Sequence, residues 1–237
     1  MTLENRVAVV TGATGGLGSV VTKELAARSV KLALLDIDPV KLETLVNDLK
    51  LTEERLFTRT VNLLDAAEAK SAAEAVTAKF GKVDILLHVV GGWTGGKTLI
   101  EASADDLTFM LNQHVWTTFH VTRAFVPYLV KNGWGRIVMI SSPYAARPNA
   151  KGGPYAVGKS GQEALMLTLS QELKGTGVTA NLLLAKTIDA KHEKLSNPTS
   201  ENTVWTTPEE LTSAILYLLS DEAGMVNGAK IPVYGSY

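Results

Sequence analysis

The stretch that decides the fold covers residues 7–18 and reads Val7-Ala-Val-Val-Thr-Gly-Ala-Thr-Gly-Gly-Leu-Gly18. Its apolar start is typical of a buried strand, and helical spacing of apolar residues follows directly. A glycine-rich turn between strand and helix brings backbone N–H groups close to a ligand, which suits a pyrophosphate. The spacing Gly12-x3-Gly16-x-Gly18 differs by one residue from the common dinucleotide-binding fingerprint. The alternative is a turn that only packs the helix against the strand.

The same order of a short apolar run and a longer helical pattern recurs along the chain. Short apolar runs predict strands at residues 7–10, 32–35, 57–61, 83–90, 136–140, 178–184 and 230–233. Apolar residues three and four apart predict helices at residues 18–27, 40–49, 66–80, 107–130, 161–173 and 208–219. This alternation predicts right-handed βαβ units, and therefore a doubly wound parallel sheet with helices on both faces. No linker divides residues 1–237, so we expect one three-layer α/β domain.

Composition excludes several classes of function. Lys and Arg number 23 and Asp and Glu 24 in 237 residues, a formal charge of −1, whereas nucleic acid or an anionic membrane requires a basic surface. The absence of cysteine excludes disulfides, thiol nucleophiles and cysteine-based metal sites. The first residues lack the positive charge of a signal peptide, and no apolar stretch approaches the ~20 residues of a membrane span. We therefore expect a cytoplasmic globular protein.

The second expected strand is followed by an acidic residue, Asp36, which lies 24 residues after Gly12. In a doubly wound fold this strand tip lies beside the adenosine ribose, where a carboxylate accepts hydrogen bonds from the 2′- and 3′-hydroxyls. The carboxylate repels a 2′-phosphate, no Arg follows closely, and Thr14 in the glycine turn is not basic. These residues favour NAD over NADP. A solvent-facing acid at a strand end is the alternative interpretation of Asp36.

A tyrosine and a lysine, Tyr155 and Lys159, open the helix after the fifth expected strand. Their i, i+4 spacing places both side chains on one face of that helix. A neighbouring ammonium stabilises a phenolate, so we expect the pKa of Tyr155 to be lowered. Ser142 lies 13 residues before Tyr155, at the strand end where such sheets bind ligands. The three residues therefore predict an acid–base site beside the glycine turn.

Together the glycine turn, Ser142 and the Tyr155-x3-Lys159 pair resemble the short-chain dehydrogenase/reductase family in its short-subunit form. Asn181 and the tail 227–233 resemble that family's structural asparagine and closing strand. The resemblance implies a Rossmann-type domain that binds NAD(P) and transfers a hydride between a hydroxyl and a carbonyl of a small molecule. It implies that Tyr155 is the general acid/base, Ser142 holds the substrate oxygen and Lys159 binds the nicotinamide ribose. It also implies a homotetramer.

The resemblance further implies cofactor contacts from several stretches of the chain. They come from the glycine turn, the ends of the second, third and fourth strands, the catalytic pair and the segment after the sixth strand. The expected contacts are Gly12, Thr14, Gly15, Gly16, Leu17, Gly18, Asp36, Asn62, Leu63, Val90, Gly91, Tyr155, Lys159 and Ile188.

Three stretches depart from the family's pattern. His88-Val-Val-Gly91 stands where the family has Asn-Asn-Ala-Gly, and Ala185-Lys186 stands where it has Pro-Gly. His114 takes the place of the family's catalytic asparagine. With a pKa near neutrality a histidine can relay a proton there, and a packed core histidine is an equal alternative. These departures motivate a second hypothesis, a cofactor-binding protein with little or no catalysis that acts as a sensor or oligomer partner.

The remaining histidines and aromatic residues predict less chemistry. His120 and His192 lack metal-ligand spacing, so we expect no metal, a packed His120 and a solvated His192 in a polar loop at 189–207. Trp93, Tyr144 and Trp205 fall near strand ends, where they line a pocket or lie at the surface. The helix at 107–130 carries apolar residues around its circumference. Because a helix that covers a sheet buries only one stripe, the extra apolar surface predicts a subunit interface.

Overall fold

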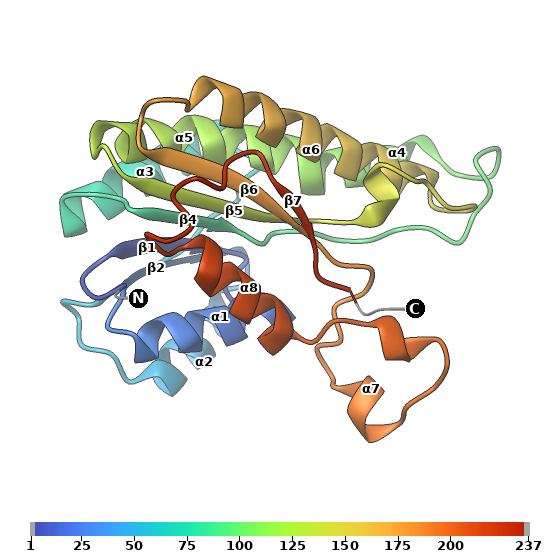
Figure 1. Ribbon diagram of the computed structural model, residues 1–237, viewed down its shortest axis with the longest axis horizontal. Coiled ribbons are helices and arrows are strands. Elements are labelled where there is room, and N and C mark those ends of the chain that lie inside the picture. The colour runs from blue at the N-terminus through green and yellow to red at the C-terminus, as the bar shows by residue number, and fades with distance from the viewer. Residues whose placement is uncertain (1–2, 235–237) are drawn as a thin grey trace.

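The computed structural model describes residues 3–234 and has one parallel sheet with helices on both faces (Figure 1). Strand order is β3-β2-β1-β4-β5-β6-β7, and every neighbouring pair is parallel. From β1 the chain first adds strands toward one edge of the sheet and then, from β4 on, toward the other edge. The position between β1 and β4 is therefore the switch point where doubly wound sheets bind ligands. The strands are β1 (Val7–Thr11), β2 (Lys31–Asp36), β3 (Leu56–Thr60), β4 (Ile85–His88), β5 (Gly135–Ser141), β6 (Val178–Leu184) and β7 (Lys230–Pro232).

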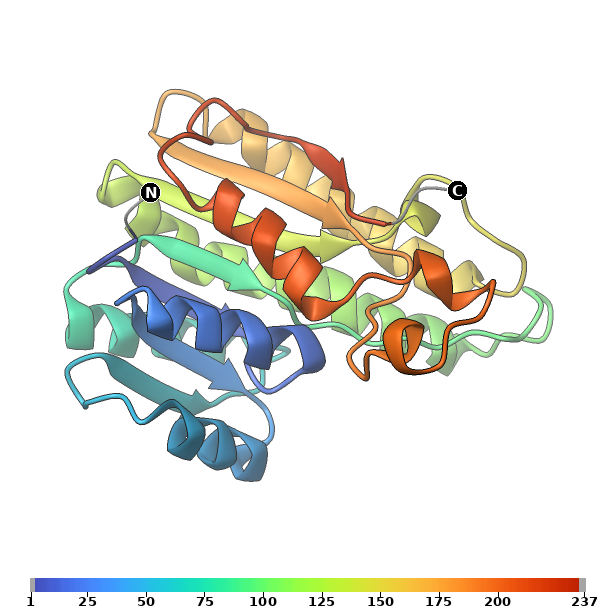
Figure 2. The same ribbon diagram turned by 60° about the horizontal axis from the view of Figure 1, so that its bottom comes forward.

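Two layers of helices cover the sheet, which confirms the expected three-layer α/β fold. One layer holds α1 (Gly16–Ala27), α2 (Pro39–Leu49) and α8 (Pro208–Leu218), and Figure 2 turns it toward the viewer. The other layer holds α3 (Ala66–Phe80), α4 (Ala104–Leu111), α5 (Thr117–Lys131) and α6 (Gly153–Glu172). Short helical turns are η2 (Pro143–Ala145), α7 (Glu193–Ser196) and η3 (Asn202–Val204). None of these helices is both long and apolar enough to cross a bilayer.

The core lies on both faces of the sheet because successive side chains of each strand point to opposite sides. In β1, Ala8 and Val10 belong to the cluster that includes Leu25 of α1, whereas Val7 and Val9 belong to the cluster on the other face. Strands that are buried on both faces read as continuous apolar runs, which is why simple runs located them. Each fully buried valine or leucine side chain contributes roughly 1.5–3 kcal/mol to the free energy of unfolding.

The helix expected at 107–130 is longer and irregular. It begins at Ala104, where Ser103 and Asp106 form a capping box, and it runs through a π-helical turn at η1 (Asn112–Trp116) into α5. A π turn adds one residue to a helix without breaking it, so the spacing of apolar residues does not reveal it. The segment 189–207 also differs from a plain loop, since α7 and η3 lie within it.

The helix expected at 161–173 begins at Gly153, with Pro154 in its first turn. The regular apolar spacing starts only at Gly161, because glycines at 158 and 161 lower helix propensity, although Tyr155 and Lys159 were expected to open this helix. A Cβ on Gly158 would meet the carbonyl oxygen of Met110 at 2.8 Å, so glycine lets α6 approach α4 closely. This contact places Tyr155 and Lys159 on α6 next to His114 on η1.

Candidate active site

A cleft of about 780 Å³ opens at the C-terminal ends of the strands, next to a smaller pocket of about 260 Å³. Gly15, Val90 and Gly91 line both. Of the residues expected from the sequence, the larger cleft is further lined by Gly16, Leu17, Gly18, His114, Tyr155, Lys159 and Ile188. The smaller pocket is further lined by Gly12, Thr14, Asp36, Asn62 and Leu63. The fold thus brings together every expected cofactor contact.

The glycine turn presents an uncapped helix N-terminus to the cleft. Gly12 has φ +68°, a left-handed conformation that favours glycine, and its N–H donates to the carbonyl of Leu35 at 2.9 Å. Gly15 is the N-cap of α1 and offers no side-chain acceptor, so no side chain caps the first turn of the helix. The dipole of α1 adds partial positive charge at the same place. A pyrophosphate fits these donors.

Asp36 is held at the tip of β2 by four local hydrogen bonds. Its Oδ2 accepts from the backbone N–H of Thr14 at 2.9 Å and from the Thr14 hydroxyl at 2.8 Å. Its Oδ1 accepts from the N–H groups of Ile37 and Asp38 at 2.8 and 3.2 Å. No sequence pattern indicates that Thr14 pairs with Asp36. The carboxylate therefore has a fixed orientation at the wall of the smaller pocket.

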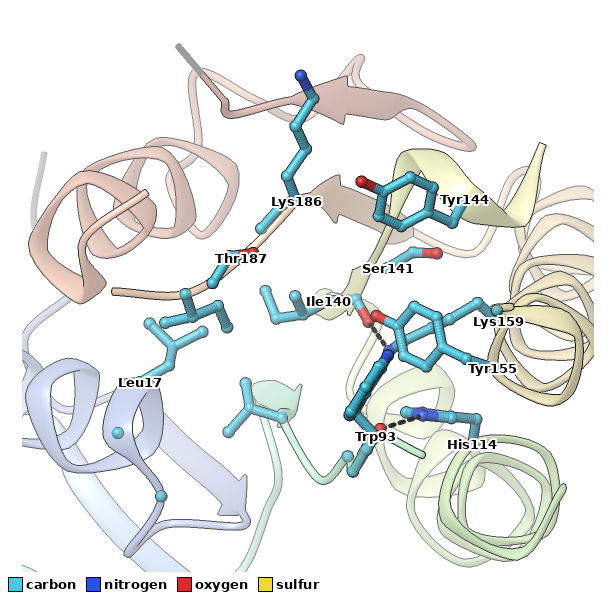
Figure 3. Close-up of a pocket in the computed structure, with 18 of the residues that line it drawn as sticks. Leu17, Trp93, His114, Ile140, Ser141, Tyr144, Tyr155, Lys159, Lys186 and Thr187 are labelled. Carbon is cyan, nitrogen blue, oxygen red and sulfur yellow. Dashed lines mark hydrogen bonds between the residues drawn. The ribbon is translucent and has the colours of Figure 1, made fainter. Parts of the chain in front are cut away.

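Ser142, Tyr155 and Lys159 lie together at the other side of the cleft, but they are not equally accessible. Ser142 follows β5 and is fully buried, and its hydroxyl accepts a long hydrogen bond of 3.4 Å from the N–H of Tyr144. Unlike Ser141, it lines neither pocket. Figure 3 shows the Tyr155 ring beside Lys159, with the phenol hydroxyl pointing into the cleft.

The pKa of Tyr155 is raised, contrary to the expectation that Lys159 would lower it. Burial is the main cause, the neighbouring Tyr144 adds to it, and a hydrogen bond with Ser142 acts in the opposite direction. The ammonium of Lys159 lies 6.0 Å from the centre of the Tyr155 ring and is turned toward the wall of the cleft. Hydrogen bonding from Ser142, and not the lysine, is therefore what favours the phenolate in this chain.

Two protein acceptors hold Lys159 in place. Its Nζ donates to the carbonyl oxygen of Ile140 at 2.8 Å and to Oε1 of Gln162 at 3.0 Å. Gln162 is itself buried and donates to the hydroxyl of Thr118 at 3.3 Å. An ammonium has three donors, so one remains for a ligand in the cleft. Burial lowers the pKa of Lys159 to about 7, and the nearby Glu163 opposes this shift.

Gln162 and Glu163 were missed in the sequence. Glu163 accepts from the hydroxyl of Ser141 at 2.7 Å and pairs with the ammonium of Lys230 on β7 at 2.6 Å. Both residues lie one helical turn after Lys159. Once the lysine is identified, this spacing predicts that they lie beside it. Lys230 lies far along the chain and carries no such local signal.

His88 and His114 are both neutral in this fold. Buried His88 bonds the hydroxyls of Thr11 at 2.7 Å and Thr117 at 3.4 Å, and burial, with Lys159 nearby, lowers its pKa to about 3. In His114, Nε2 lies 2.9 Å from the carbonyl of Gly92, whereas Nδ1 is buried without a partner. Burial lowers the pKa of His114 to about 3 as well, so the premise of a relay with a near-neutral pKa was wrong.

The other aromatic and histidine residues divide between the cleft and the surface. Trp93 and Tyr144 line the larger cleft, whereas Trp205 lines neither pocket. His120 bonds the carbonyl of Leu63 at 3.0 Å, and exposed His192 pairs with Glu209 at 2.9 Å. Within residues 3–234, no three His, Asp or Glu side chains gather as a metal site would require.

A comparison with known families agrees with this geometry. The model of the short chain dehydrogenase family matches residues 6–201. The chain belongs to this family. It is therefore an oxidoreductase by family, and the resemblance inferred from its motifs is confirmed.

Individual relatives extend over the whole chain. The 3-oxoacyl-(acyl-carrier-protein) reductase FabG of Thermotoga maritima is 29% identical over 243 residues, which covers 99% of this chain and 98% of that protein. Carveol dehydrogenase from Mycobacterium avium, solved in complex with NAD, matches with a TM-score of 0.85 at 24% identity, covering 98% of this chain and 96% of that one. An NAD⁺-bound xylitol dehydrogenase matches with a TM-score of 0.89 at 20% identity over all of both chains.

Proposed function

We propose that the protein is an NAD(H)-dependent oxidoreductase that interconverts a small secondary alcohol and its carbonyl compound. The observation that carries the proposal is that Tyr155 and Lys159 line the same cleft as the glycine turn, with the buried Ser142 hydrogen-bonded to Tyr155. The acid–base group of such a reaction must lie within reach of both the substrate oxygen and the cofactor site. The bound nicotinamide supplies the chemistry by accepting or returning the hydride of the carbinol carbon.

The chain's own residues handle the proton. In alcohol oxidation the Tyr155 phenolate takes the proton of the substrate hydroxyl. In carbonyl reduction the Tyr155 hydroxyl donates a proton to the carbonyl oxygen. The Ser142 hydroxyl, which is buried and lines neither pocket, stabilises the phenolate through its hydrogen bond with Tyr155. The third N–H of the Lys159 ammonium is free to bind the cofactor. The other two N–H groups donate to the Ile140 carbonyl and to Gln162.

NAD is the cofactor that these residues fit better. Asp36 lines the pocket expected to hold the adenosine, and neither Lys nor Arg lines that pocket. A 2′-phosphate would therefore meet a carboxylate without any compensating positive charge. Two solved structures of similar fold, the carveol and xylitol dehydrogenases, hold NAD, which supports the same choice.

Cofactor binding and turnover test the proposal separately. We expect NADH to quench or shift tryptophan fluorescence at lower concentration than NADPH, and a panel of alcohols and carbonyls to change reduced-cofactor absorbance. Saturable NADH binding without turnover of any compound would favour the alternative of a catalytically weak cofactor-binding protein. Tighter binding of NADPH would contradict the role of Asp36.

We also propose a cytoplasmic homotetramer. Its support is the row of exposed apolar side chains on the α4–α5 helix, because covering such a row stabilises an assembly. Phe109 and Trp116 are 44% and 49% exposed there, whereas Phe125 and Leu129 are buried against the sheet. Light scattering behind size exclusion tests the assembly, and a monomer at micromolar concentration would contradict it.

A further inference from the structure

The charge of the larger cleft is one-sided. Among the side chains that line it are three lysines, Lys151, Lys159 and Lys186, and no aspartate or glutamate. The chain as a whole holds 24 acidic residues against 23 basic ones, so this imbalance is local. Low-dielectric walls strengthen such a field, and a cleft lined by one sign of charge attracts the opposite sign.

Two carboxylates on segments next to the cleft are paired with other groups. Asp189 lies in the segment after β6, but both of its oxygens accept from the backbone of α7, from Glu193 N–H at 2.8 Å and Lys194 N–H at 2.9 Å. Glu163 lies behind Lys159 and pairs with Lys230. Neither carboxylate lines the cleft, so neither one offsets its lysines there.

Lys186 is the lysine best placed to meet a substrate. It follows β6 at the position where the family pattern has glycine, two residues before Ile188. It is half-buried, and within residues 3–234 no carboxylate oxygen lies within ion-pair distance of it. Its Nζ lies 5.4 Å from the centre of the Tyr234 ring, a contact that holds the side chain while leaving the charge unneutralised.

The opposite wall carries the acid–base group. Figure 3 shows the Tyr144 and Tyr155 hydroxyls pointing into the cleft from one side, and the Lys186 side chain on the other side with its ammonium pointing away from Tyr155. A substrate whose oxygen lies at Tyr155 would have to extend past Tyr144 to reach the Lys186 ammonium. Tyr144 offers an aromatic surface and a further hydrogen-bond donor along this path.

From this arrangement we propose that the substrate carries an anionic group, a carboxylate, and that Lys186 binds it while Tyr155 acts on the alcohol or carbonyl carbon. The inference rests on the proposed function and names the class of its substrate. An ammonium that is half-buried, with no counter-ion among residues 3–234, regains an electrostatic partner when a carboxylate binds. Glycine at this position, as in the family pattern, offers no such charge.

Binding of a matched pair of probes tests the proposal without turnover. With the protein saturated in NADH, benzoate and its uncharged isostere benzamide are titrated by calorimetry. We expect benzoate to bind about tenfold more tightly or better, the usual size of a hydrogen bond to a charged group, and added salt to weaken benzoate selectively. Equal affinity, or no binding of benzoate, would overturn the proposal.

Two lysine variants assign the effect to one side chain. Lys186→Met should remove the preference for benzoate and leave NADH affinity unchanged. Lys191→Met removes a charge from the same segment outside the cleft and should keep the preference. If Lys186→Met weakens benzamide and benzoate equally, or weakens NADH as much as benzoate, the lysine serves the fold or the cofactor and the proposal fails.

Turnover distinguishes this proposal from the proposed function. For the wild type, we expect kcat/KM to be about tenfold higher with 4-(1-hydroxyethyl)benzoate than with its amide. For Lys186→Met, we expect kcat/KM to be the same with both compounds. Equal turnover of acid and amide would overturn the anionic substrate and leave the oxidoreductase intact. The opposite result is that no compound is turned over, while benzoate still binds selectively to the wild type and to Tyr155→Phe. That result would overturn the oxidoreductase and leave the anion site.

Discussion

The two ends of the site are built in different ways. At the adenosine end, the glycine turn and Asp36 are held by hydrogen bonds between residues that are close in sequence or on adjacent strands, as in the pair of Thr14 and Asp36. At the catalytic end, Lys159 is held by the carbonyl of β5 and by Gln162, which reaches Thr118 on α5. The first end depends on backbone shape and the second on buried side chains from distant elements. Substitutions should therefore change cofactor choice at the first end and proton handling at the second.

The largest effect is expected from Tyr155→Phe, which removes the hydroxyl proposed as the acid–base group and keeps the ring. We expect turnover to fall by about 10²–10⁴-fold, the usual contribution of general acid–base catalysis, with NADH affinity retained. Steady-state assays with fluorescence titration of NADH measure both. Tyr217→Phe, at an exposed position of α8, is the matched control. Unchanged turnover in Tyr155→Phe would remove this residue from the mechanism.

A smaller effect is expected from Gln162→Leu, which removes one of the two acceptors of the Lys159 ammonium. Burial already lowers the pKa of Lys159 to about 7, and the loss of Gln162 should lower it further. The charged form then persists only at lower pH, so the limb of the pH–rate profile that reports Lys159 should move to lower pH. In Gln162→Glu, a carboxylate beside the ammonium should move that limb to higher pH.

The measurement for Gln162 is the pH dependence of kcat/KM, because a loss of packing alone would lower the rate without moving the limb. Gln171→Leu changes an exposed glutamine of the same helix and should leave the profile in place. Movement of the limb in the same direction in Gln162→Leu and Gln162→Glu would contradict this view of the catalytic end.

At the adenosine end, Asp36→Ala should narrow the preference for NAD over NADP by about tenfold, since the repulsion of a 2′-phosphate is removed. Thr14→Ala removes one hydrogen bond to Asp36 but keeps its charge, and should retain the preference. The ratio of NADH to NADPH dissociation constants measures both variants. If the two variants narrow the ratio equally, orientation by Thr14 and not the charge of Asp36 decides the choice.

The smallest effect is expected from His114→Asn. The pKa of His114 is held at about 3 by burial, so the imidazole stays neutral across the working pH range and its removal should not change the pH profile. We expect activity to be equal or higher, because the asparagine matches the family pattern. A lower Tm with unchanged turnover per folded molecule would mark His114 as a packing residue.

The sequence predicts the backbone-built parts well and the side-chain network poorly. Apolar runs located all seven strands, of which β1, β2, β4, β5 and β6 are mostly buried and the edge strands β3 and β7 are partly exposed, and glycines marked the turn. Every expected cofactor residue lines one of the two pockets because strand ends in such a sheet converge. The pKa values of Tyr155 and His114 were wrong in direction or premise, because they depend on burial, which neighbouring letters do not encode. Glu163 and Lys230 meet only once β7 is placed beside β6.

One extra residue in the path of the backbone has a consequence for the evolution of this site. The π turn at η1 rotates everything after it relative to α4, so Met110 before it and Thr118 after it both reach the active-site side. A single-codon deletion within residues 112–116 would restore a regular helix and turn one of these sides away. Such a lineage would keep Tyr155 and Lys159 in its sequence and lose the helix packing that positions them.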